Sequence, residues 1–236
     1  MTTLRIRGRI ATAALALCAA GTAFGGLVAG LGVPAAATDV AAPAPSEKQE
    51  IGVGVSRLPS FLKTSQLPQG SRYGTWKAGG VYTGTPRNPK FCLGNDVLPA
   101  AETRYRTYRG KKNVAAEEFV TIADNDAAAA ALVSKLRSQI QGCYSAWLDA
   151  DIPQYRDGKR SASWKRYGTY AVEDGMTIIG VFTVPPKGFV KTTHLYAVGR
   201  DGAMVVVLHL GVPGGKAKAP VGKFTTAGAT ALRQAL

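Results

Sequence analysis

Two Asp-Gly turns divide the most regular stretch of this sequence, and they restrict what the chain can fold into. Asp174-Gly175 and Asp201-Gly202 each stand between two strand-like runs, a pattern typical of a tight β-hairpin. Residues 176–184 are apolar on both faces, which predicts a strand in the interior of a sheet. The strands are expected over residues 166–172, 176–184, 192–198 and 203–210.

A second hairpin is expected earlier in the chain. Residues 103–108 alternate, so that Arg104, Arg106 and Tyr108 share one face, and this predicts a strand with one wet face. A polar turn then leads into a strand over 114–122. Residues 73–91 are rich in glycine, proline and tyrosine, and we expect an irregular loop or an edge segment there.

Helices are expected on both sides of these strands in the sequence. Asp124 can cap a helix whose apolar residues recur at helical spacing up to Cys143. Pro220 opens an amphipathic terminal helix, and residues 58–67 form a short helix or turn that ends at Pro68. The fold class is therefore α+β, an antiparallel sheet of about five to six strands with packed helices.

The start of the chain is typical of an export signal, which we place at residues 1–37. Arginines at positions 5, 7 and 9 precede an uncharged apolar run, and Ala35-Ala36-Ala37 follows it. An uncleaved membrane anchor is the alternative, because a run of roughly 24 apolar residues can cross a bilayer. Residues 38–53 predict a disordered linker, and 54–236 one extracytoplasmic domain.

Two cysteines, Cys92 and Cys143, follow the signal. In an oxidising compartment an even pair is most simply a disulfide, which would join the helix ending near Cys143 to the segment at Cys92. Closing this loop stabilises a fold by about 4 kcal/mol in the chain-entropy model. Metal binding is the weaker alternative, since no C-x-x-C pair is present. We expect neither a metal nor a cofactor.

The charge balance indicates the class of partner. The formal charge is +14, and +11 remains without the three signal arginines. A basic protein outside the cell attracts anionic envelope polymers, lipids or small ligands, and nucleic acid is less available there. The alternative is that the basic residues only keep the surface soluble. Arg104 and Arg106, on a wet strand face, are the candidate anion-binding residues.

Known catalytic signatures are missing. The sequence has no G-x-S-x-G, H-E-x-x-H or S-x-x-K motif. The histidines, His194 and His209, lie inside predicted strands, where a histidine is more often hydrogen-bonded in place than catalytic. Together they could bind a metal, but no third ligand is evident. His194 joins Arg104 and Arg106 as a candidate ligand-binding residue.

The order of motifs resembles the PknH-like extracellular sensor domains of actinobacterial receptor kinases, and the secreted proteins that share their fold. The resemblance spans residues 58–232. It rests on the early Leu-Pro segment, Phe91-Cys92, the helix closing on Cys143, Trp164 with Tyr167-Gly168, Asp174-Gly175, Gly199-Arg200-Asp201-Gly202 and the terminal amphipathic helix. Mycobacterial domains of this kind commonly have two disulfides, whereas this chain has cysteines for one after the signal.

The resemblance implies ligand sensing in the cell envelope by a cleft, and a disulfide between Cys92 and Cys143. It implies no particular ligand residue. Two hypotheses follow. The first is a secreted, non-enzymatic ligand-binding or sensor-like module of the envelope. The second is a secreted hydrolase with a dispersed active site around His194 or His209.

Overall fold

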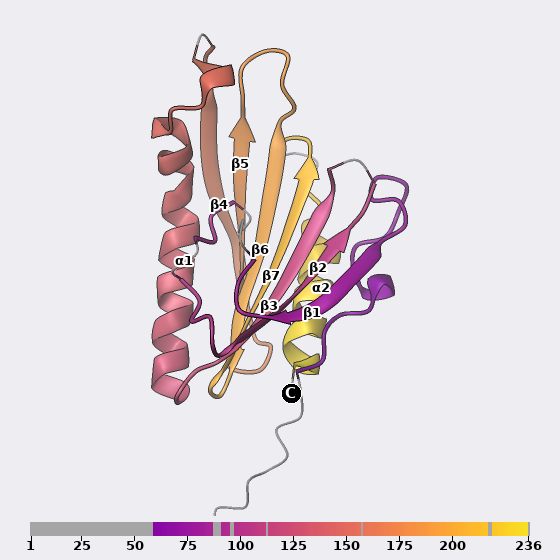
Figure 1. The fold of residues 1–236 in the computed structure, drawn as a ribbon, viewed down its shortest axis with the longest axis vertical. Helices are drawn as coiled ribbons and strands as arrows, with labels where there is room; N and C mark the ends of the chain where they lie inside the picture. Colours follow the sequence, from indigo (N-terminus) through magenta and orange to yellow (C-terminus); the bar gives the residue numbers. More distant parts are fainter. Residues whose placement is uncertain are drawn as a thin grey trace, which may run out of the picture. The chain divides into compact units, whose positions relative to one another are not determined.

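A seven-stranded antiparallel sheet lies at the centre of the fold (Figure 1). The computed structural model describes residues 59–86, 91–94, 97–111, 113–156, 158–216 and 219–235. These belong to one compact unit, Val53–Leu236, and the expected signal and linker lie outside the described residues. The strands are β1 (Lys77–Thr83), β2 (Thr103–Arg109), β3 (Ala115–Ile122), β4 (Ser161–Tyr170), β5 (Met176–Val184), β6 (Thr192–Asp201) and β7 (Met204–Pro213).

The sheet order is β1-β2-β3-β7-β6-β5-β4, so the early hairpin joins the later strands through the β3–β7 pair. The expected α+β class and antiparallel sheet are confirmed, with one strand more than expected. The additional strand is β1, from the segment for which an irregular loop or an edge was expected. Both of its faces are mostly exposed, so it lacks the apolar alternation that marks a half-buried strand.

The other edge also differs from the expectation. β4 begins at Ser161, five residues before the expected start at 166. The sequence did not predict these first residues because most of this edge strand is exposed and its sequence is polar. The first long helix, α1 (Asp126–Asp149), continues past Cys143. Its N-cap is Asn125, whose Oδ1 accepts from Ala128 N–H at 2.9 Å, and not Asp124 as expected.

One helix covers each face of the sheet. α1 packs on β4 to β7, while α2 (Val221–Gln234) packs on β5 to β7 from the opposite side. The apolar faces expected for both helices are buried. α2 lies so close to β6 that a Cβ at Gly199 would come within 2.8 Å of Leu232 Cδ2. Within the described part of the chain, no helix is both long and apolar enough to span a bilayer.

The two Asp-Gly turns meet at one end of the sheet. Asp174 Oδ2 accepts from Arg200 Nη1 and from Gly202 N–H, both at 2.8 Å. Glu173, Gly175 and Gly202 all have positive φ, as such turns require. The carboxylate of one hairpin turn therefore holds the other, which aligns β4–β5 with β6–β7.

The segment before β1 is held on the α2 side of the sheet by a buried carboxylate. It is irregular apart from one short 3₁₀ helix, η1 (Thr64–Gln66). Glu118 Oε2 accepts from Leu62 N–H at 2.9 Å and from Tyr108 O–H at 2.8 Å. Phe61 and Leu62 are buried in the core, as expected. Burial raises the pKa of Glu118 to about 7, although these two donors and Arg106 act to lower it.

Glu118→Gln tests how much the ionisation of this buried carboxyl lowers the free energy of unfolding. The Glu118 carboxyl binds its proton more tightly in the folded chain than in the unfolded chain, where its pKa has the ordinary value of 4.5. The contribution of Glu118 to stability is therefore fully present below pH 4.5 and is lost as the pH rises through about 7. The loss is roughly 3 kcal/mol. The Gln carbonyl can accept the same two hydrogen bonds, so this variant should unfold at higher urea than the parent at about pH 8, with little difference at about pH 5.

Glu102→Gln, at an exposed position, is the matched control and should leave the pH profile unchanged. A parent-like fall in stability between pH 5 and pH 8 in the Glu118 variant would contradict the assignment.

Candidate functional site

An apolar pocket of about 590 Å³ lies over the disulfide. The C-terminal half of α1 forms one wall and residues 91–94 form the other. The lining consists of Phe91, Cys92, Leu93, Gly94, Gln139, Gly142, Cys143, Ala146 and Trp147. A pocket of about 280 Å³ beside Arg72 and Lys111, and one of about 420 Å³ beside Glu102 and Asp124, have charged walls.

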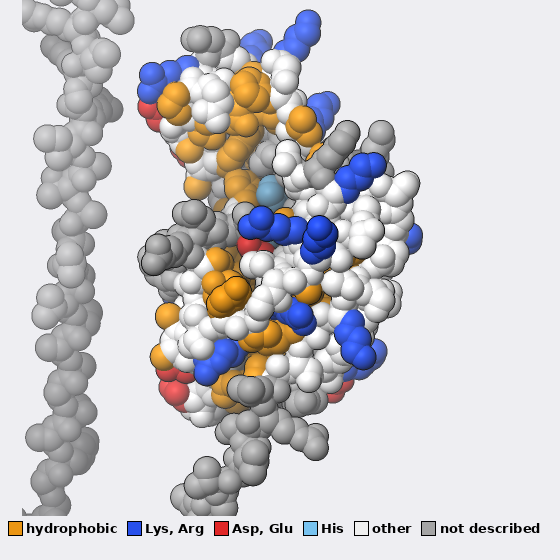
Figure 2. All heavy atoms as spheres, turned by 45° about the vertical axis from the view of Figure 1, so that its right-hand side comes forward, with side chains coloured by type: hydrophobic (Ala, Val, Ile, Leu, Met, Phe, Trp, Pro, Cys, Tyr) orange, Lys and Arg blue, Asp and Glu red, His pale blue; other side chains and the backbone are white. Residues whose placement is uncertain are grey.

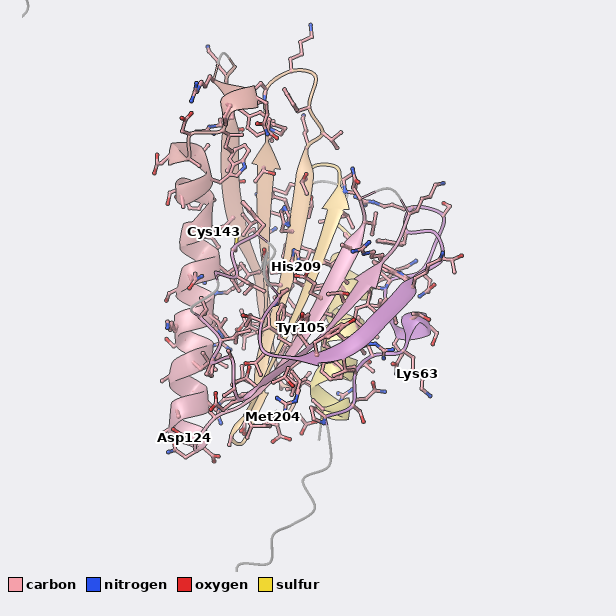
Figure 3. The ribbon with its side chains drawn as sticks, viewed as in Figure 1. Lys63, Tyr105, Asp124, Cys143, Met204 and His209 are labelled. Atoms are coloured by element: carbon pink, nitrogen blue, oxygen red, sulfur yellow. A yellow bond between two sulfur atoms is a disulfide. The ribbon has the colours of Figure 1, made fainter. Side chains whose placement is uncertain are left out.

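The expected bond between Cys92 and Cys143 is present, and both cysteines line this pocket. The two Cα atoms are 5.3 Å apart, and the bond joins residues separated by 51 positions. Figure 3 labels Cys143, which belongs to α1. Cys92 has φ 70°, a conformation that residues other than glycine seldom adopt, and Gln139 Nε2 donates to its carbonyl at 3.2 Å. The cross-link and this hydrogen bond hold both walls in place.

The two histidines meet on the same face of the sheet as α1. β6 and β7 are neighbours, and His194 Nδ1 lies 3.1 Å from His209 Nε2. On the other side of β7, Glu117 of β3 pairs with His209, and Glu117 Oε2 lies 3.7 Å from His209 Nδ1. Figure 3 labels His209 in the middle of the sheet. Glu117, His209 and His194 thus form one row across three strands.

The inner end of this row is buried and the outer end is not. Glu117 and His209 are 2% and 1% exposed, and neither Glu117 Oε2 nor His209 Nδ1 has a hydrogen-bond partner within the described residues. His194 is partly exposed. If His209 keeps its Nδ1 proton toward Glu117, its Nε2 accepts from His194 Nδ1–H, and Nε2 is then the unprotonated nitrogen of His194.

Phe91 lies between the pocket and the histidine row. Its ring lines the pocket and also packs on His194, with the ring centroids 4.5 Å apart. Tyr196 O–H donates to the Phe91 carbonyl, and the Tyr196 ring stacks on His209 at 4.8 Å. The apolar pocket and the histidine row are therefore two parts of one site that share a wall.

Protein surrounds most of the His194 ring even though part of the residue reaches solvent. This burial, together with the neighbouring His209, holds the pKa of His194 well below its ordinary value of 6.5. Burial also raises the pKa of Tyr196 well above 10.0, with a smaller contribution from Glu117. At neutral pH the outer histidine is uncharged and the tyrosine keeps its proton.

The arginines named from the sequence do not join this site. Arg104 and Arg106 share a face with Tyr108, which lies in the core on the α2 side, whereas His194 lies on the α1 side. Arg106 Nε donates to Gly79 O at 2.9 Å, and Arg104 Nη1 donates to the carbonyls of Ala101 and Thr103. Both are half-buried and hold the backbone around the β1–β2 hairpin. An anion-binding role for them stays a prediction.

Glu117 was missed from the sequence, although a signal for it was present. Glu117 and Glu118 stand side by side in the expected strand over 114–122, so they must point to opposite faces. In a strand covered on both faces, both carboxylates become buried. No group of three or more His, Cys, Asp or Glu side chains suited to a metal ion occurs among the residues that the structure describes.

Comparisons with known proteins give one structural match to report. No family model matches the sequence, and no curated protein matches it significantly. The fold is similar to the crystal structure of the extracellular domain of PknH from Mycobacterium tuberculosis, with 10% identity and a TM-score of 0.44, over 75% of this chain and 98% of that one. At this depth of similarity, only the chain's own residues indicate what its site does.

The titration of His194 tests the histidine row. Proton NMR should show His194 uncharged down to a pH well below 6.5, and His209→Phe should raise that pKa because one of its two causes is removed. The unfolded chain takes up the proton first, so stability is fully present above pH 6.5 and is lost as the pH falls below it. His194→Asn, which keeps a donor at the Nδ1 position, should remove that loss. An ordinary pKa for His194 in the parent would contradict the structure.

Proposed function

We propose that this chain is a non-enzymatic ligand-binding module that works outside the cytoplasm, in the cell envelope. The observation that carries the proposal is the apolar pocket of about 590 Å³ over the disulfide. This volume falls in the range of small-molecule sites, which are concave, mostly apolar and largely preformed. A disulfide of this kind persists in oxidising compartments, which supports the extracytoplasmic location.

The lining favours an apolar or amphiphilic ligand. Phe91, Leu93, Ala146 and Trp147 supply apolar surface, and the disulfide sulfurs are polarisable and uncharged. Gln139 is the polar side chain of the lining, and its Nε2 is already engaged with the Cys92 carbonyl. A charged group inside the pocket would lose its hydration without a partner of opposite charge. We therefore infer that the ligand places a chain or ring in the pocket and any polar group toward its mouth.

The pocket walls favour ready binding because little has to be ordered when a ligand enters. Val133, Leu136 and Ile140 anchor α1 to the sheet, and the disulfide ties residues 91–94 to the helix. A preformed apolar site loses less conformational entropy on binding than a flexible one.

Gly142 allows the pocket to be filled without harming the fold. A Cβ at this helical position meets nothing within 4 Å, and replacing a helical glycine stabilises a helix by about 1 kcal/mol. Gly142→Leu should abolish the fluorescence gain of anilinonaphthalene sulfonate and of a dansyl-labelled fatty acid, while thermal stability is kept or raised. Gly142→Ala, the matched control, should keep binding, since one methyl group fills little of the space.

Ser138→Leu, an exposed α1 position outside the lining, controls for added surface apolarity and should also bind like the parent. Equal probe binding by the parent and Gly142→Leu would exclude the pocket as the site.

A hydrolase is the second candidate, and the row of Glu117, His209 and His194 is the observation that favours it. A buried carboxylate and histidine behind an outer histidine is an arrangement that can orient a general base toward water. Against it, no Ser, Thr or Cys side chain hydrogen-bonds to His194 within the described residues. The reaction would have to use water directly.

Esters of short and long acids, offered to the purified chain, decide between the two candidates. A catalytic row predicts hydrolysis that His194→Gln abolishes and that His209→Gln reduces with a shifted pH profile. Absence of turnover in the parent, or turnover that survives the loss of both histidines, would dismiss the hydrolase.

A further inference from the structure

Aromatic and apolar side chains, two of them exposed, gather at one end of the domain. Figure 1 shows that α1 finishes and the β5–β6 loop turns at this end. We call this the aromatic tip: Trp147, Tyr155, Phe189 and Val190. Phe189 is 45% exposed and Val190 66% exposed. Figure 2 shows apolar side chains at this upper end with lysine and arginine side chains around them. An exposed apolar patch with a polar rim is typical of a protein or membrane interaction site.

The tip is held in shape by contacts between two loops far apart in the sequence. The Phe189 ring meets the edge of Tyr155 at 4.8 Å, and Tyr155 packs beside Trp147 at 6.1 Å. Arg160 lies over the Trp147 ring at 5.5 Å and donates to the carbonyls of Leu148 and Ala150. The exposed Phe189 ring therefore packs on Tyr155, in the 3₁₀ helix Pro153–Tyr155, and Tyr155 packs in turn on Trp147 near the end of α1.

Cations surround the tip. Lys187 and Lys191 flank Phe189 and Val190 in the same loop, and all four side chains are exposed. Exposed Lys216 lies in the adjoining turn, where Gly214 N–H donates to the Lys191 carbonyl at 2.7 Å. Of the described acids near this end, Asp151 is paired with Arg156 at 2.6 Å and Asp149 is exposed at the end of α1.

We propose that the aromatic tip docks on an anionic lipid surface, with Phe189 and Val190 entering the headgroup region and Lys187 and Lys191 meeting the lipid phosphates. Aromatic and apolar side chains ringed by lysine match the chemistry of a membrane interface, where rings sit at headgroup level and lysine stems lie along apolar surface. Each lysine near an anionic leaflet strengthens binding about fivefold.

Docking at the tip is separate from ligand binding in the pocket. The tip residues Tyr155, Phe189 and Val190 do not line the pocket, and Gly142 is not part of the tip. Trp147 belongs to both, so the tip would bring the mouth of the pocket close to the lipid. Gly142→Leu should therefore bind vesicles like the parent, whichever way the pocket experiment comes out.

Co-sedimentation of the secreted protein with vesicles tests the proposal. The parent should bind vesicles of phosphatidylglycerol and phosphatidylcholine, and bind vesicles of phosphatidylcholine alone much less. Phe189→Ser with Val190→Ser should weaken binding roughly tenfold or more, from the apolar surface lost. Lys187→Ala with Lys191→Ala should weaken it roughly 25-fold and flatten its dependence on salt.

The control variants make the same kinds of substitution at exposed positions outside the aromatic tip. Ile122→Ser removes an apolar side chain that is 50% exposed outside the tip, and Lys77→Ala with Lys135→Ala removes two exposed cations. Both should bind vesicles like the parent. Vesicle binding unchanged in the two tip variants overturns the proposal, as does a soluble polyphosphate that binds through Lys187 and Lys191 while anionic vesicles do not bind at all.

Discussion

β7 lies in the middle of the sheet, hydrogen-bonded to β3 on one side and β6 on the other, and its register with both strands decides which buried side chains meet. His209 pairs with Glu117 of β3 and with Tyr196 of β6. A slip of one residue would turn His209 toward α2 and separate it from His194. The contact between Asp174 and the Arg200–Gly202 turn holds the neighbouring hairpins in line. The row of Glu117, His209 and His194 depends on this register.

The two carboxylates of β3 are both buried, because the sheet is covered on both faces. Glu118 finds two donors on the α2 side, from Leu62 and Tyr108, and it holds the N-terminal segment to the core. Glu117 has a histidine at 3.7 Å on the α1 side. Buried polar groups persist when partners compensate for lost hydration. Glu118 has such partners and fastens the chain, whereas Glu117 Oε2 has no hydrogen-bond partner among the described residues and lies next to His209.

The disulfide has a local role that the register cannot supply. It brings residues 91–94 against α1, and the space between them is the apolar pocket. On one side of the pocket, the Phe91 ring packs on His194. On the other side, Trp147 packs beside Tyr155, which in turn contacts Phe189. Apolar side chains in contact with one another therefore extend from the pocket beside the disulfide to the exposed loop between β5 and β6.

Local patterns in the sequence predicted the central strands, the two helices and the cysteine pair, because apolar periodicity and turn residues act over a few neighbouring residues. It did not identify β1 or the early start of β4, since exposed edge strands bury no face and leave no periodic trace. The strand order of the fold is what brings His194, His209 and Glu117 together and leaves Arg104 and Arg106 on the opposite face of the sheet. Strand order and register are long-range properties, which no local pattern encodes.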